Sequence, residues 1–302
     1  MNDGQGSHKK KNYSGSKELK LVKDALSADL NGDGKEELIL VGEWMGVRVL
    51  ESQNRELIDI SSILLEDDYL GWWNSIETAD LNSDGKADLL LGNQGLNNQF
   101  MSSKAEPLEL YAKDFDGNGS VDPLFCYYIQ GKSYPYITRD ELLSQLPQFR
   151  SNFTSFASYS EVGLDKLFPE SVLKTSDYFR AEHLSTTILM SNAQGGYSNV
   201  KLPQEVQYAP VHSMQVWDVD KDGAPDVLLF GNNSHSKLRL GKSDANYGIL
   251  IKGDGKGGFK YIGQAYSGLN VEGDVRSSLM IKGQLFLGIN GKKVATYKLR
   301  AF

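Results

Sequence analysis

The chain has one cysteine among its 302 residues, and this scarcity excludes an internal disulfide bond. Cys126 lies in the apolar run LFCYY, so we expect a buried thiol that packs as a small hydrophobic side chain. Runs of about 18 apolar residues are also absent, and the sequence therefore predicts no transmembrane segment. Residues 1–18 are polar and lack the apolar centre of a signal peptide, so we interpret them as a disordered leader or linker.

Positive charge and histidine are also scarce. The chain has 32 Lys and Arg against 39 Asp and Glu, which gives a formal net charge of −7 and argues against nucleic acid as a partner. The sequence has four histidines with no paired metal-ligand spacing, and it contains neither G-x-S-x-G nor H-E-x-x-H. None of these familiar catalytic motifs is therefore available.

Acidic residues are plentiful, and many of them fall in a nine-residue loop that occurs four times. The first copy lies in ADLNGDGKEELILVG, and the others begin in TADLNSDGKADLLLG, AKDFDGNGSVDPLFC and VWDVDKDGAPDVLLF. Positions 1, 3 and 5 are acidic or amide residues, position 6 is glycine, and position 9 is a carboxylate. The matched side chains at positions 1, 3, 5 and 9 are Asp29, Asn31, Asp33 and Glu37; Asp80, Asn82, Asp84 and Asp88; Asp114, Asp116, Asn118 and Asp122; and Asp218, Asp220, Asp222 and Asp226.

This spacing predicts metal binding, because alternate oxygen-bearing side chains in a tight loop can converge on one hard cation. Position 7 would contribute only its backbone carbonyl, so its side chain can vary. The residues there are Lys35, Lys86, Ser120 and Ala224. The ligand positions contain no His or Cys, which argues against zinc, and a flexible ring of carboxylates argues against magnesium. A polar turn is the alternative for one copy; four copies favour up to four Ca²⁺ ions.

The residues after each loop distinguish these sites from an EF-hand, which requires a glutamate at position 12 and flanking helices. Position 12 is apolar in all four copies, within short glycine-bounded runs that are typical of buried strands. We therefore expect strand-loop-strand sites that stabilise the structure rather than catalyse a reaction. The loop from Asp218 has four carboxylates against three in each other loop, so we expect it to bind calcium most tightly.

Further strand signals surround the acidic loops. Residues 46–60, 185–202 and 247–262 are typical of hairpins, each with two apolar runs around a polar, glycine-bearing turn. The literal G-x-G-x-x-G at 253–258 falls in the last of them, and we interpret it as a hairpin turn. A strand, an acidic loop, a buried strand and a hairpin make about four strands, as in a propeller blade. The sequence predicts an all-β fold over residues 19–302, a β-propeller of five to seven four-stranded blades.

One long segment departs from this pattern. Residues 137–168 are helical in character, and we expect a small helical insertion at about 137–177. Thr138 with Glu141 and Ser158 with Glu161 are predicted capping boxes, and Pro147 can begin a new helix. Three phenylalanines, Phe149, Phe153 and Phe156, share one face at helical spacing and are expected to pack in the core.

The acidic loops followed by DLLLG and the GKGGF turn resemble FG-GAP/VCBS repeats, the units of integrin α-type propellers. The stretches VGEWMGVRV, GWWNSIETADLNSDG, GNQGLNNQF and LYAKDFDGNGSVDP, then ITRDELLSQLP, are most similar to bacterial surface or secreted proteins related to cartilage acidic protein. This resemblance implies a calcium-stabilised propeller with an exported or cell-surface location, within a longer surface protein. Glu37, where the repeats usually have Asp, and the missing signal peptide depart from the family pattern.

The function we expect is therefore non-enzymatic: adhesion-like binding of an extracellular protein or glycan ligand. The alternative is a polysaccharide lyase or hydrolase on a calcium-binding propeller, with acidic residues outside the loops such as Glu43, Glu77 or Asp177. A cluster of such residues in a pocket would favour the enzyme. Trp44, Trp72 and Trp73 could stack on sugar rings, although burial between blades is the preferred interpretation.

Overall fold

The computed structural model describes residues 19–298, so the expected leader at residues 1–18 lies outside the described residues. Strands predominate in five antiparallel sheets, which confirms the all-β class. None of the described sheets closes on itself, and the ring of blades stays a prediction. The chain forms two compact units: one comprises the described residues up to 97 and from 185 onward, and the other comprises residues 98–184.

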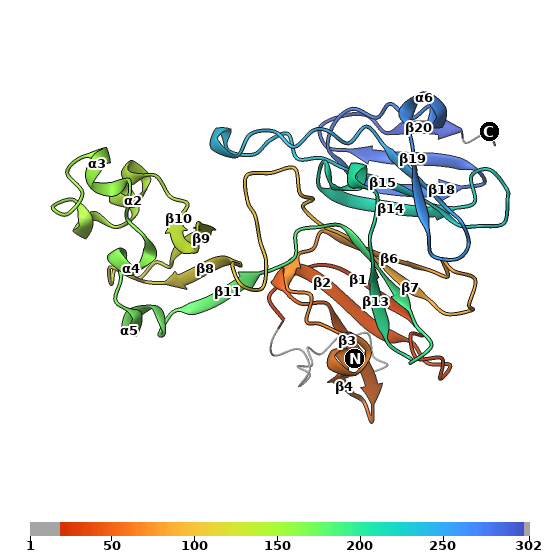
Figure 1. Ribbon diagram of the computed structural model, residues 1–302, viewed down its shortest axis with the longest axis horizontal. Helices are drawn as coiled ribbons and strands as arrows, with labels where there is room; N and C mark the ends of the chain where they lie inside the picture. The colour runs from red at the N-terminus through yellow and green to blue at the C-terminus, as the bar shows by residue number, and fades with distance from the viewer. Residues whose placement is uncertain (1–18, 299–302) are drawn as a thin grey trace, which may run out of the picture. The chain divides into compact units, whose positions relative to one another are not determined.

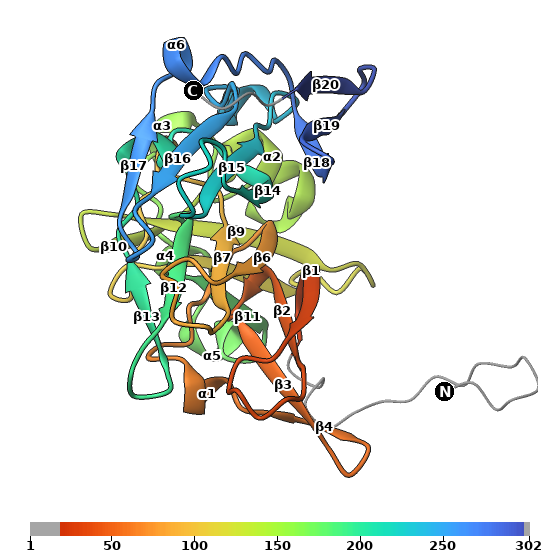
Figure 2. The ribbon, with the colours of Figure 1, turned by 90° about the vertical axis from the view of Figure 1, so that its right-hand side faces the viewer.

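The first unit contains four of these sheets (Figures 1 and 2). Its short helices are α1 (Ser61–Leu64), η3 (Gln204–Gln207), η4 (Leu238–Leu240) and α6 (Gln264–Ser267). The strands, sheet by sheet, are β1 (Leu21–Ala28), β2 (Glu37–Met45), β3 (Arg48–Gln53) and β4 (Glu56–Asp59), with β5 (Gly71–Trp72) paired to β2; β6 (Ser75–Ala79), β7 (Asp88–Gly92), β12 (Thr187–Ser191) and β13 (Tyr197–Val200); β14 (Val211–Trp217), β15 (Asp226–Gly231), β16 (Ile249–Gly253) and β17 (Phe259–Ile262); and β18 (Val275–Ile281), β19 (Gln284–Ile289) and β20 (Ala295–Lys298).

The four sheets pack in series. β1 lies beside β6, β6 beside β14, and β14 beside β18. Side chains alternate between the two faces of a strand, so Leu89 and Leu91 enter the core shared with the first sheet, while Leu90 enters the core shared with the third. Leu228 and Phe230 likewise enter the core shared with the fourth sheet. Because both faces of β7 and β15 are buried, their sequences are continuous apolar runs rather than alternating ones.

The second unit holds one sheet and most of the helices. Its strands are β8 (Leu108–Lys113), β9 (Asp122–Ile129), β10 (Lys132–Pro135) and β11 (Asp177–Ala181), in the order β10-β9-β8-β11. Its helices are α2 (Arg139–Gln145), η2 (Pro147–Phe149), α3 (Phe156–Tyr159), α4 (Leu164–Leu167) and α5 (Glu170–Leu173). Cys126 on β9 is fully buried and free, as expected.

The helical details confirm one capping box and correct the other. Thr138 and Glu141 form the predicted box at the start of α2. The box predicted for Ser158 and Glu161 is wrong: Ser155 caps α3 and its reciprocal partner is Ser158. The extended backbone of Ser155 starts the helix three residues earlier, and the helix ends at Tyr159, before Glu161.

The predicted phenylalanine stripe is only partly in the core. Phe149 and Phe153 pack in the cluster that contains Leu142 and Phe168. Phe156 is 67% exposed, and the Arg139 guanidinium lies over its ring at 5.4 Å from the ring centroid. The three phenylalanines do not lie on one helix, because η2 ends at Phe149 and α3 begins at Phe156. The helical spacing that predicted a shared face therefore does not apply to Phe156.

The second unit is inserted into a single sheet of the first. β6 and β7 precede it, β12 and β13 follow it, and β12 pairs directly with β7. The three predicted hairpins are confirmed as β3–β4, β12–β13 and β16–β17. The glycine-rich motif is the turn of the last hairpin, where the Asp254 carboxylate accepts hydrogen bonds from the N–H groups of Lys256 and Gly258.

Candidate metal-binding loops

All four acidic loops occupy the same place in their sheets. Position 1 follows the last residue of one strand, and position 9 is the first residue of the next. The residues that flank each loop form a cross-strand pair, so the register is identical in the four copies. The pairs are Ala28–Glu37, Ala79–Asp88, Lys113–Asp122 and Trp217–Asp226.

The position 9 carboxylates are buried in every loop, with at most 4% of each residue exposed. In each case one carboxylate oxygen accepts the N–H of the residue at position 2. These bonds join Glu37 to Leu30 (2.9 Å), Asp88 to Leu81 (2.8 Å), Asp122 to Phe115 (3.0 Å) and Asp226 to Val219 (2.9 Å). A buried carboxylate is costly unless it is both hydrogen-bonded and paired with positive charge. The hydrogen bonds are present, and a cation in the loop would supply the charge.

Two of these buried carboxylates also reach a third strand. The other oxygen of Asp88 accepts the Ser191 N–H of β12 at 2.8 Å, and that of Asp226 accepts the Gly253 N–H of β16 at 3.0 Å. Burial raises the pKa of both carboxyl groups and that of Glu37, although the backbone N–H bonds act in the opposite direction. Carboxylates of the same loop raise these pKa values further. A cation bound beside these oxygens would act in the opposite direction and favour the charged forms.

Backbone N–H groups hold the remaining ligand side chains in place. The position 1 carboxylate accepts the N–H of the position 6 glycine, at 2.9, 2.8, 2.8 and 3.0 Å in chain order. These glycines, Gly34, Gly85, Gly119 and Gly223, have φ between +82° and +89°, which side chains other than glycine rarely adopt. The N–H of each position 7 residue donates to the side chain at position 5, in Lys35, Lys86, Ser120 and Ala224 alike.

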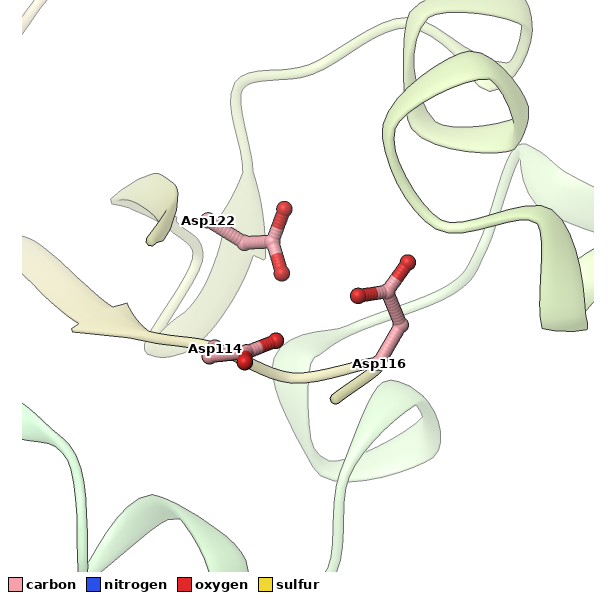
Figure 3. Close-up of side chains that lie close together, drawn as sticks. All are labelled: Asp114, Asp116 and Asp122. Atoms are coloured by element: carbon pink, nitrogen blue, oxygen red, sulfur yellow. The ribbon is translucent and has the colours of Figure 1, made fainter. Parts of the chain in front are cut away.

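In two loops three carboxylates converge closely. Asp114, Asp116 and Asp122 each bring one oxygen within 4.8 Å of the others, as do Asp218, Asp220 and Asp222. Figure 3 shows the first group: Asp114 and Asp116 project from the loop after β8, and Asp122 projects toward them from the start of β9. A donor set made only of oxygens fits calcium. The twenty predicted ligand positions thus share one loop geometry, and the identity of the ion stays a prediction.

Two residues from neighbouring strands also contact the loops, and the loop pattern alone did not indicate them. The Ser191 hydroxyl donates to the Asp84 carboxylate at 2.8 Å. The Lys252 ammonium lies 2.9 Å from an Asp222 carboxylate oxygen and also pairs with Asp220. The signal that could have found them is the alignment of SNAQGGY with GDGKGGF: Ser191 is the last residue of β12, and Lys252 is the residue before the equivalent position, Gly253, at the end of β16.

The residues of the enzymatic alternative lie on three different strands, β2, β6 and β11. Glu43 is ion-paired with Lys23 at 3.0 Å, and Asp177 belongs to the second unit. Glu77 is partly buried on β6, where burial raises its pKa and the nearby Asp24 raises it further. Among the tryptophans, Trp73 is fully buried, which fits packing between sheets rather than sugar stacking. Trp44 and Trp72 contact each other edge to face, with ring centroids 5.0 Å apart.

Comparison with known proteins identifies the repeat. Residues 29–91, which hold the first two acidic loops, match the family model of the FG-GAP-like repeat. The repeat family expected from the loops is therefore confirmed over that range. None of the curated proteins matches the chain.

One solved structure that shares features with this chain is that of the V. cholerae biofilm matrix protein Bap1. The sequences are 10% identical, the TM-score is 0.25, and the similarity covers 88% of this chain and 59% of Bap1. The chain thus spans less than two thirds of the length of that protein. Within residues 19–298, no helix is long and apolar enough to cross a membrane.

Proposed function

We propose that this chain is a calcium-stabilised β-propeller module of an exported or cell-surface protein, and that it binds an extracellular protein or glycan ligand without catalysing a reaction. The observation that carries the proposal is the fourfold repetition of one loop geometry. Each copy buries a carboxylate at position 9 and holds further oxygens around it.

Calcium accounts for this geometry better than the loop's own hydrogen bonds do. The position 9 carboxylates accept one or two N–H groups, yet burial still raises the pKa of Glu37, Asp88 and Asp226. A divalent cation bound by the same oxygens would favour their charged forms and remove the repulsion within the loop. Bound at the junction of two paired strands, the ion would fasten the sheet rather than activate a substrate.

The propeller is the architecture that the packing supports best. The first strands of four sheets follow one another in series, and each pair of neighbouring sheets shares an apolar core. A ring continues such a series and leaves no open sheet face at either end. The match of residues 29–91 to FG-GAP-like repeats supports the same architecture. A family relation to cartilage acidic protein and an exported location belong to this proposal.

Calcium binding is tested by isothermal titration of the full chain after extraction with chelator, with magnesium as the competing ion. We expect calcium binding with a stoichiometry of up to four, together with a rise in melting temperature that chelator reverses. Asp116→Ala, which removes the oxygen ligand at position 3, should remove one binding event. Asp244→Ala, which removes an exposed carboxylate outside the loops, is the matched control and should remove none. A chain that binds no calcium, or whose melting temperature is the same with and without it, would refute the calcium part of the proposal.

A further inference from the structure

The first unit contains a cavity of about 710 Å³ beside the start of β12 and the end of β13. Its walls come from two regions that are distant in the sequence, residues 96–97 and residues within 185–208, and both belong to this unit. The lining residues are Leu96 and Asn97, residues 185–187, residues 199–202, and Gln204, Gln207 and Tyr208. This volume lies in the range of pockets that bind small molecules.

Gln207 braces the walls of the cavity. The residue is buried, with 8% of its surface exposed. Its side-chain amide accepts the Thr186 N–H at 2.9 Å and donates to the Thr186 carbonyl at 2.8 Å. Its backbone carbonyl accepts the N–H groups of Leu96 and Asn97 at 2.8 and 3.1 Å. The Asn97 amide in turn donates to the carbonyl of Tyr208 at 3.1 Å. A site held in this way loses little conformational freedom when a ligand binds.

The lining groups have the chemistry of hydroxyl recognition. Thr187 donates its hydroxyl to the Asn199 side-chain oxygen, which leaves the Asn199 NH₂ group as a donor. Within the described part of the chain, the side chains of Ser185, Gln204 and Tyr208 form no hydrogen bond with one another or with other residues. Amide and hydroxyl groups can both donate and accept, and the hydroxyls of a sugar require such partners.

The lining of the cavity is uncharged except at one residue, which fits a neutral ligand. No Asp or Glu lines it, and its one charged lining residue, Lys201, is exposed. Leu96 and Leu202, with the ring of Tyr208, supply an apolar surface for the less polar face of a ring.

We propose that this cavity binds a neutral saccharide unit of an extracellular glycan. The inference rests on the proposed ligand-binding function and assigns a place and a ligand class to it. Asn199 and Gln204 supply hydrogen bonds to sugar hydroxyls, Tyr208 contacts the sugar ring, and Lys201 plays no part.

The test uses the full chain in excess calcium against an array of neutral and acidic oligosaccharides, followed by titration with the best neutral binder. We expect Asn199→Leu and Gln204→Ala each to weaken binding about tenfold, as loss of one hydrogen bond to a buried polar ligand group predicts. Tyr208→Ala should weaken it more than Tyr208→Phe. Lys201→Met, a matched control on the same rim, should change the affinity less than about twofold. Melting curves of Gln204→Ala and Lys201→Met should coincide with that of the parent chain, because both side chains are exposed. Asn199→Leu leaves the buried Thr187 hydroxyl without its acceptor, so its binding is compared at a temperature at which its melting curve shows it folded.

Three results would overturn the inference, and they differ in what they leave standing. If the folded chain binds calcium but no neutral saccharide, the cavity assignment fails while the calcium-stabilised module stands. Glycan binding that survives both Asn199→Leu and Gln204→Ala leaves the ligand-binding function intact but places it elsewhere. Binding confined to acidic saccharides and lost in Lys201→Met would contradict the neutral ligand class.

Discussion

The loops at 80–88 and 218–226 have the same backbone geometry but different electrical surroundings. In both, a buried position 9 aspartate joins its own loop to a neighbouring strand through two N–H groups. Extending the register of each strand pair by one residue places Met190 on β12 across from the first aspartate and Lys252 on β16 across from the second. Only the later loop therefore has an ammonium group supplied by the next strand.

Because of this difference, the number of carboxylates would not by itself set the calcium affinity of the proposed sites. The hydrogen bond from Lys252 lowers the pKa of Asp222, and both carboxylates of the pair raise the pKa of Lys252. A calcium ion bound at 218–226 would compete with that ammonium, whereas at 80–88 Asp84 receives only the neutral Ser191 hydroxyl from the next strand. The higher charge of the later loop, which favours tight binding, is thus partly offset.

The largest effect should come from the feature that the two loops share. We expect Asp88→Ala and Asp226→Ala each to lower the free energy of unfolding by about 2–4 kcal/mol, because each leaves two buried N–H groups without an acceptor. Urea denaturation in excess chelator measures this cost separately from metal binding. Asp140→Ala, at an exposed aspartate of α2, is the control and should cost less than about 1 kcal/mol. A cost that small for Asp88→Ala would contradict the assigned role of the buried carboxylate.

A reciprocal exchange tests the feature that differs. Lys252→Met gives the later loop the neighbour that the earlier one has, and Met190→Lys does the reverse. We expect about tenfold tighter calcium binding at 218–226 in the first variant and weaker binding at 80–88 in the second, because ligand charge sets calcium affinity. Calcium titration of each variant against the parent chain measures the change.

The control for this exchange is Lys260→Met. Lys260 is the cross-strand partner of Lys252, and its removal changes the net charge by the same amount. If it tightens calcium binding as much as Lys252→Met does, the effect comes from the overall charge of the chain. Unchanged affinity in Lys252→Met would show that the ammonium moves away from the loop at no cost.

The loops and their strands could be predicted from the sequence because their signals are local. Position 9 begins a strand in all four copies, since the ligand spacing and the apolar run after it lie within about fifteen residues. The insertion of residues 98–184 into one sheet could not be predicted in this way. It depends on the pairing of Leu91 with Thr187, whose partners are far apart along the chain, and the sequence gives no local sign of which strand β7 will meet.

The candidate loops could likewise be predicted only as far as their local sequence pattern extends. The repeated spacing identified the side chains at positions 1, 3, 5 and 9 of each loop, but it did not indicate which neighbouring strand would contribute Ser191 or Lys252. The second capping box failed for a related reason: Ser155 and Ser158 compete with Ser158 and Glu161 for the same helix start, and packing of the surrounding chain selects the earlier one. Long-range packing decides between local signals of similar strength.

The smallest expected effect concerns position 4, where the two loops resemble each other and differ from the rest. Ser83 and Lys221 adopt φ of 63° and 64°, whereas the loops from Asp29 and Asp114 have Gly32 and Gly117 at this position, with φ of 78° and 76°. Left-handed backbone is strained for residues with a Cβ, while glycine loses more entropy on folding. We expect Ser83→Gly and Lys221→Gly to raise the free energy of unfolding by about 0.5–1 kcal/mol.

The reverse change supplies the control for that prediction. Gly32→Ser introduces the same strain in a loop that lacks it and should lower stability by a similar amount, about 0.5–1 kcal/mol. No atom lies within 4 Å of a Cβ placed on Gly32, so the cost reports backbone strain rather than a steric clash. All three variants are compared by urea denaturation at saturating calcium, which holds the metal contribution constant. If Ser83→Gly destabilises the chain, the serine must contribute an interaction that outweighs the strain, and the two pairs of loops would then differ in more than backbone conformation.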